Sequence, residues 1–141
     1  MWTKRIHYLT EVNELSDYLK KVNNFTDCII SSFSFYSEKK LLYLTIEEDK
    51  ASSDFTNSSS LVWDLKCECV SDFLMKDMGG LSKWWLHALY FEDNYLHFHL
   101  LDGYFSFKVT DFKLGIPYSS KTSIGNDIQS LHIDYLLQEF K

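Results

Sequence analysis

The sequence predicts an α+β domain: an antiparallel β-sheet meander of about six strands, with an N-terminal helix and a C-terminal helix packed on it. The chain has 141 residues, a length typical of one domain, so residues 1–141 are expected to form a single unit. A helical apolar stripe lies near the N-terminus, whereas most of the chain up to about residue 115 resembles strands. Aromatic residues make up 17% of the chain and supply large apolar side chains for a sheet to bury.

A helix is expected over residues 10–22. Thr10 suits the N-cap, because its hydroxyl can accept a hydrogen bond from a free backbone N–H of the first turn. Acidic residues come early and lysines late in the segment, which favours the helix dipole. The apolar residues share one stripe of the helical period: Val12, Leu15, Leu19 and Val22.

Three strands are expected next. Residues 28–36 and 41–48 are joined by a short polar link and are typical of a hairpin. Residues 49–60 are polar and low in complexity, which indicates a surface loop. Residues 61–70 alternate with the period of a strand and form the clearest strand pattern in the chain. The alternate residues that share one face of this expected strand are Leu61, Trp63, Leu65, Cys67 and Cys69.

The second half continues the meander after a helical turn expected over residues 72–78. Asp102-Gly103 indicates a two-residue hairpin turn, because both positions favour residues that tolerate a positive φ. A second turn is expected over residues 92–94. The strands connected by these turns cover residues 84–91, 95–101 and 104–109.

The C-terminal segment carries two competing patterns after a loop over residues 115–125. Leu131, Ile133 and Tyr135 alternate as in a strand. Residues 126–140 begin with a capped, acidic turn, as a helix does. We favour the helix, which completes the predicted α+β fold.

The charge balance argues against a nucleic-acid partner. Lys and Arg number 14 and Asp and Glu 20, a formal charge of −6, whereas affinity for nucleic acids depends on Lys and Arg at the phosphates. An acidic protein suits a basic partner. No signal peptide is recognised, and the apolar run over residues 84–91 is far shorter than the roughly 20 residues of a membrane-spanning helix. The odd number of cysteines, 3, favours a reducing compartment, so we expect a cytoplasmic protein.

Catalytic motifs are not recognised, so we expect neither an enzyme nor a bound cofactor. The chain has no Gly-x-Ser-x-Gly motif and no phosphate-binding glycine loop. Cys67 and Cys69 lie two residues apart, a spacing less typical of zinc ligands than of a strand that buries both side chains. His97 and His99 share one side of a strand and could bind a metal with His87, although such a pair is more typical of the solvent face of a sheet.

Trp84 and Trp85 are expected to point to opposite faces of their strand. One of the two indole rings therefore lies outside the main core. This indicates either a covered second face of the sheet or an exposed aromatic residue that anchors a partner.

Three stretches resemble the immunity proteins of bacterial toxin systems, including contact-dependent growth inhibition: Phe25–Ile30, Val62–Leu65 and Leu89–Asp93. The resemblance extends to the small size, the acidic composition and the aromatic-rich sheet. It implies an inhibitor that binds one cognate toxin domain, often a nuclease, and blocks its active site or substrate surface. These proteins share no fixed set of contacts, so no binding residue is transferred from the resemblance.

Electrostatics gives the candidate contacts instead. A nuclease carries positive charge to hold its polyanionic substrate, so acidic residues near loops would attract it, with aromatic residues beside them as anchors. We expect a monomer or a weak homodimer. The alternative function is a domain that binds a small ligand or a metal through the aromatic face and His97 and His99. The candidate partner contacts are Glu47, Glu48, Asp49, Asp54, Tyr90, Glu92, Asp93 and Tyr95.

Overall fold

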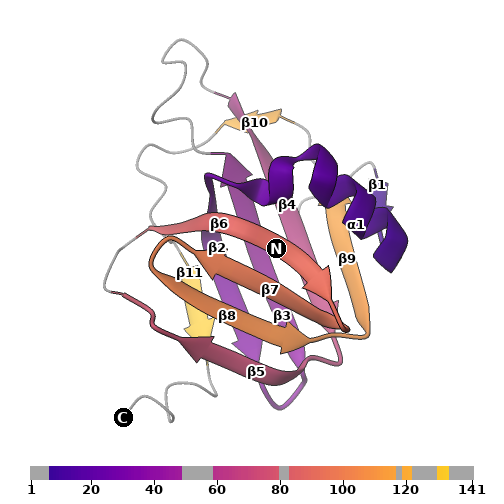
Figure 1. Ribbon diagram of the computed structural model, residues 1–141, viewed down its shortest axis with the longest axis vertical. Coiled ribbons are helices and arrows are strands. Elements are labelled where there is room, and N and C mark those ends of the chain that lie inside the picture. Colours follow the sequence, from indigo (N-terminus) through magenta and orange to yellow (C-terminus); the bar gives the residue numbers. More distant parts are fainter. Residues whose placement is uncertain (1–6, 49–58, 80–82, 117–118, 122–129, 134–141) are drawn as a thin grey trace.

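The computed structural model describes residues 7–48, 59–79, 83–116, 119–121 and 130–133 (Figure 1). Within these ranges the chain is mostly antiparallel β-sheet, with 11 strands and a single α-helix. The predicted six-stranded meander between two terminal helices is therefore wrong. Periodicity identified several strands but not the pairings between strands distant in sequence.

The strands form two layers that are joined at one edge (Figure 1). The rear layer contains, in spatial order, β1 (His7–Leu9), β9 (Asp111–Ile116), β4 (Ser59–Glu68), β3 (Leu41–Glu48) and β2 (Cys28–Tyr36). The front layer contains β6 (Trp84–Glu92), β7 (Tyr95–Leu100), β8 (Gly103–Lys108) and β5 (Ser71–Lys76). Two short strands lie off this path: β10 (Ser119–Lys121) pairs with β4, and β11 (Ser130–Ile133) pairs in parallel with β2.

The two layers are joined where β2, at the edge of the rear layer, pairs with β6, at the edge of the front layer. Ile29 is opposite Trp85 and Ile30 is opposite Trp84, after which β6 crosses in front of the rear strands (Figure 1). The two layers can then bury their facing side chains against each other, as in packed sheets. Each layer therefore has one inner face, which packs against the other layer, and one outer face, which points away from it.

Aromatic rings fill the space between the layers. Phe33 on β2 lies 5.2 Å from Phe105 on β8 and 5.6 Å from Trp84 on β6, measured between ring centroids. Phe35 on β2 stacks on Phe73 of β5 at 4.7 Å. The expectation of an aromatic core is confirmed by these contacts.

Helix α1 (Val12–Lys21) confirms the predicted N-terminal helix. Its buried residues, Leu15 and Leu19, belong to the predicted apolar stripe. The observed N-cap is Glu11, one residue later than predicted, and Glu11 makes no side-chain capping hydrogen bond. The helix packs against β6 and the short 3-10 helix η1 (Asn23–Phe25), beside the rear layer (Figure 1).

The alternation of β4 is confirmed at Trp63, Leu65 and Cys67, which are all buried. Cys69 departs from the prediction, because β4 ends at Glu68 and Cys69 follows it with a positive φ of 57° and an exposed side chain. Beyond the last paired residue of a strand, the alternation of the sequence no longer decides to which side of the sheet a side chain points.

Three other expectations need correction. Residues 72–78 are not a helical turn: β5 occupies most of this segment, and a register shift between Ser71 and Leu74 interrupts its ladder with β8. The segment 115–125 is not all loop, since β9 ends at residue 116 and β10 covers 119–121.

The C-terminal helix expected over residues 126–140 is also wrong where the structure describes it. Residues 130–133 form β11, whose Leu131 and Ile133 pair with Phe33 and Phe35 of β2. The strand alternative for Leu131 and Ile133 is the correct one, and Tyr135 lies outside the described residues. Tertiary pairing overrides the local helix signal.

Candidate functional site

The outer face of the front layer carries a dense group of half-exposed rings. Along β7, Leu96, Phe98 and Leu100 are buried, whereas the alternate side chains point away from the core. Hairpin register places the outward side chains of β6, β8 and β5 beside them. We call this surface the ring face: Trp85, His87, Tyr90, Tyr95, His97, His99, Tyr104, Leu74 and Leu101.

The two expectations made for this surface are confirmed. His97 and His99 lie together on the outer side of the sheet, with Phe98 inside. Trp84 contacts the core ring of Phe105, whereas Trp85 is exposed. The exposed indole is the aromatic side chain predicted to lie outside the core.

Two hydrogen bonds connect four rings at the centre of the ring face. Tyr90 Oη lies 3.0 Å from His99 Nε2, and His97 Nδ1 lies 2.8 Å from Tyr104 Oη. The Tyr90 ring is stacked on both imidazoles, at 4.8 Å from His97 and 5.5 Å from His99. Both phenol hydroxyls and one nitrogen of each imidazole are therefore hydrogen-bonded within the cluster, across β6, β7 and β8.

A β-bulge in β6 adds a third imidazole. Leu86 pairs with Leu100 but Ala88 pairs with His99, so His87 is an extra residue on the β6 side of the ladder. His87 is exposed, and its backbone carbonyl accepts a hydrogen bond from Thr26 Oγ1 at 2.9 Å. The bulge therefore places His87 at the margin of the four-ring cluster.

Acidic side chains gather at one end of the ring face. Asp93 and Asn94, with φ values of 55° and 69°, form the two-residue turn between β6 and β7, as in tight hairpins. Glu92, at the end of β6, is register partner to Tyr95, whose hydroxyl donates to Asp72 Oδ2 at 2.8 Å. Glu92, Asp93 and Asp72 are exposed, so the acidic end is accessible to solvent.

The second hairpin turn differs by one residue from the prediction. Leu100 pairs with Gly103, so Leu101 and Asp102 are the two turn residues. Gly103 begins β8 with a φ of 150°, which favours glycine. As a result Leu101 lies at the end of the ring face opposite to the acidic end, next to Trp85. The backbone N–H of Leu101 donates a hydrogen bond to the carbonyl oxygen of Trp85 at 2.9 Å.

The environment shifts three pKa values in this cluster. Burial lowers the pKa of His99, and the neighbouring His97, His87 and Lys76 lower it further. Burial raises the pKa of Tyr90, with contributions from Tyr104 and Glu92. Donation to Asp72 raises the pKa of Tyr95. The cluster thus favours a neutral His99 and neutral phenols.

Protonation of His99 is expected to destabilise the fold. Its pKa is lowered in the folded protein, so the unfolded chain binds the proton more readily, and the free energy of unfolding falls as pH drops below about 6.5, the usual histidine pKa. Urea unfolding of wild type and His99→Gln between about pH 7.5 and 5 measures this, and the variant is expected to show a shallower loss. An imidazole NMR titration of His99 with a midpoint at or above the ordinary value would contradict the prediction.

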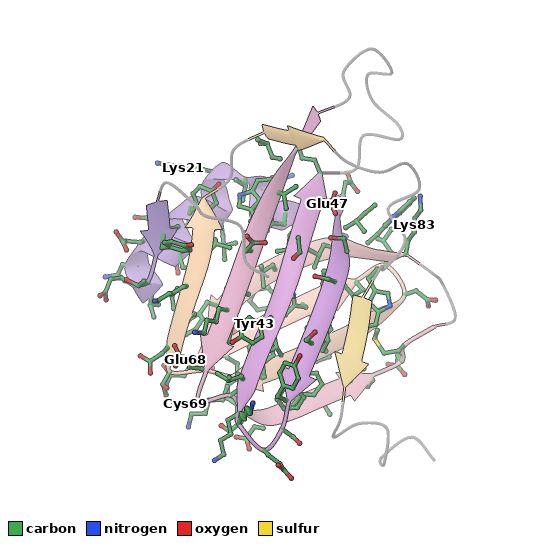
Figure 2. All side chains as sticks on the ribbon, turned by 180° about the vertical axis from the view of Figure 1, so that it is seen from behind. Lys21, Tyr43, Glu47, Glu68, Cys69 and Lys83 are labelled. Atoms are coloured by element: carbon green, nitrogen blue, oxygen red, sulfur yellow. The ribbon has the colours of Figure 1, made fainter. Side chains whose placement is uncertain are left out.

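The predicted partner contacts that the structure describes lie on two different layers. Tyr90, Glu92, Asp93 and Tyr95 are brought together at the acidic end of the ring face. Glu47, by contrast, is labelled on the rear layer in Figure 2, near the end of β3 and on the other side of the molecule.

Glu48, a further predicted contact, is not part of the ring face either. Glu48 belongs to β3, and its Oε1 accepts a hydrogen bond from the Leu61 N–H at 3.2 Å. Asp49 and Asp54 lie outside the described residues. Glu47 and Glu48 are therefore separated from Tyr90, Glu92, Asp93 and Tyr95, because β3 and β6 belong to different layers.

The sequence did not single out Leu74, Tyr104 and Leu101 as partner contacts, whereas an exposed indole at Trp84 or Trp85 was one of its two alternatives. The signals for Trp85 and Tyr104 were present, since both lie in predicted hairpin strands whose register places them beside the two histidines. Leu74 had no such signal, because its segment was interpreted as helical.

Within the described residues, no cluster of three or more His, Cys, Asp or Glu side chains could hold a metal ion. Cys67 is fully buried, and burial raises the pKa of its thiol. This fits the prediction that Cys67 is a core residue, whereas Cys69 is exposed.

Comparison of the chain with protein-family models, curated proteins and solved structures yields no match. Among the described residues, no helix has both the length and the apolar character needed to cross a membrane.

Proposed function

We propose that this protein is a non-enzymatic inhibitor of the immunity type, which binds a cognate bacterial toxin domain in the cytoplasm and neutralises it. The observation that supports the proposal is the ring face, where the half-exposed rings of Tyr90 and Tyr95 adjoin Glu92, Asp93 and Asp72 and the exposed Trp85 lies at the other end. Tyrosine and tryptophan are enriched among the residues that dominate binding energy at protein interfaces.

The electrostatics of the chain supports a basic partner. A formal charge of −6 attracts a positively charged domain over a distance and raises the association rate. A nuclease domain has such a charge, because it must hold a polyanion. Carboxylates of the inhibitor can occupy the region where the nucleic acid would bind, which blocks the reaction without any chemistry by the inhibitor.

Binding to the toxin domain is expected to be tight and sensitive to salt. Binding of the toxin domain encoded next to this chain would be followed by surface plasmon resonance at about 50 and 300 mM salt, a range over which screening of exposed charges strengthens. The association rate is expected to fall by about tenfold or more at the higher salt, with a smaller change in the dissociation rate. A toxin domain of a different system provides the control.

Two results would contradict the proposed function. One is no detectable complex with the neighbouring toxin domain. The other is a complex that leaves the activity of the toxin unchanged, because an inhibitor must do more than bind.

A further inference from the structure

We propose that the ring face is a two-ended docking surface for a basic protein, with an apolar end at Trp85 and Leu101 and an acidic end at Glu92, Asp93 and Asp72. The inference deepens the proposed function and rests on it, since it names the surface and the chemistry of the partner. The partner presents an apolar side chain at one end and cationic side chains at the other.

The apolar end is formed by side chains that the fold leaves uncovered. Trp85 is 37% exposed and Leu101 is 53% exposed. Leu74, 48% exposed, lies on the same side of the front layer, because its register partner Ser106 is opposite His97. Three of the five exposed large hydrophobic residues of the described chain are therefore on this one face, and a grouping of that kind marks interaction sites.

The acidic end has an excess of negative charge. Its exposed carboxylates are Glu92, Asp93 and Asp72, and the neighbouring cation on the front layer is Lys108, the register partner of Tyr95. One ammonium group leaves this excess uncompensated, so cations of a partner are attracted to this end.

The apolar end has a different charge pattern. Lys83 lies over the Trp85 ring at 5.7 Å, and Lys76 lies over the Tyr104 ring at 5.4 Å. Asp102, in the β7–β8 turn, and Asp77, just after β5, offset these two lysines. The cations of a basic partner are thus directed to the β6–β7 turn and not to the Trp85 end.

The length of the face favours a macromolecule. From Trp85 to Glu92 the strand β6 advances by about 20–23 Å, at roughly 3.3 Å per residue. A small ligand does not span this distance, whereas a protein surface can contact both ends at once. Contact at both ends raises affinity through the effective concentration of the second contact.

Between the two ends, part of the hydrogen-bonding capacity of the ring face is already used within the cluster. The central hydroxyl and imidazole atoms bond to one another in the pairs Tyr90–His99 and His97–Tyr104. These bonds use one nitrogen of each imidazole, so a partner that covers the rings meets paired hydroxyls but has to offer polar groups to His97 Nε2 and His99 Nδ1. The central rings provide a surface on which a partner can pack, and the apolar and acidic ends determine the orientation of that partner.

A synthetic peptide tests the surface without the toxin. It carries Leu-Leu at one end and Arg-Lys-Arg at the other, separated by about six Ser and Thr residues so that its extended length matches the face. In an NMR titration, signals of the Trp85 indole and the Asp93 amide are expected to shift together and to saturate. A peptide with a spacer of about two residues is expected to bind at least about fivefold more weakly, because it reaches only one end.

Charge reversal identifies the acidic end. Glu92→Lys is expected to weaken peptide binding at least about fivefold, because it replaces an attractive contact by a repulsive one. Glu68→Lys is the matched control on the rear layer, where Glu68 is labelled in Figure 2, and is expected to leave binding unchanged. Circular dichroism of both variants verifies that each is folded.

Several outcomes would overturn the docking surface: no saturable shifts, equal binding of the two peptides, or equal loss in the two variants. Sedimentation that shows a dimer in wild type and a monomer in Trp85→Ser would assign the face to a second copy of this chain and would also overturn the proposed docking surface.

If the neighbouring toxin domain binds Glu92→Lys and Trp85→Ser as tightly as wild type, the surface is wrong and the proposed function stands. If the peptide binds as expected and the toxin domain does not bind at all, the proposed function is wrong.

Discussion

Replacing Phe105 by alanine is expected to lower the free energy of unfolding by about 3–5 kcal/mol, as is usual for a buried phenylalanine. The side chain is fully buried on β8 and contacts rings from both layers. Its centroid lies 5.2 Å from Phe33 across the layers and 4.5 Å from Phe98 on the neighbouring strand. Alanine would leave a cavity at the place where the layers meet, and neither sheet can collapse fully to fill it.

Urea unfolding followed by tryptophan fluorescence and by circular dichroism would measure the loss. Phe105→Leu is the control, because it keeps most of the apolar volume and is expected to cost clearly less than alanine. An alanine variant that loses less than about 1 kcal/mol would show that this ring does not hold the layers together.

Elements with strong local patterns were the predictable part of the fold. The stripe containing Leu15 and Leu19 predicted helix α1, and the alternation at Trp63, Leu65 and Cys67 predicted β4. These patterns succeed because burial on one side imposes the period of the element on the sequence. The hairpin of β6 and β7 was predictable for the same reason, together with its polar turn.

The pairings between distant segments were not predictable. β1 pairs with β9 and β11 pairs with β2, across separations that leave no trace in a local period. In β5, Asp72 adopts a φ of 52° and the ladder shifts register, so the segment lacks regular alternation. A strand of this kind is recognisable only once its partner β8 is known.

The candidate site divides in the same way. The register of one hairpin brings Tyr90, Glu92 and Tyr95 together, and this neighbourhood follows from the sequence. Glu47 is on the other layer because β2 pairs with β6, a long-range contact. Which acidic residues share a surface therefore depends on the layering, whereas local spacing decides only which of them share a strand.

Trp63→Ala is the second substitution with a large expected effect, about 3–5 kcal/mol in the free energy of unfolding, as for other buried aromatic residues replaced by alanine. Trp63 is 3% exposed and connects three elements. Its Nε1 donates to Tyr18 Oη of helix α1 at 2.8 Å, and its ring lies 4.8 Å from Phe25 of η1 in an edge-to-face contact. The substitution removes apolar packing and a hydrogen bond together.

A double-mutant cycle separates these two contributions. Tyr18→Phe removes only the acceptor and is expected to cost about 1 kcal/mol, the usual net value of one hydrogen bond. In the Trp63→Ala background the same change is expected to cost much less, since the donor is already absent.

Hydrogen exchange of the α1 amides should accelerate in Trp63→Ala more than exchange in β7, because the helix loses its contact with β4 whereas the front layer keeps its own ladder. Equal acceleration in both elements would show that Trp63 stabilises the fold as a whole and does not hold the helix in place.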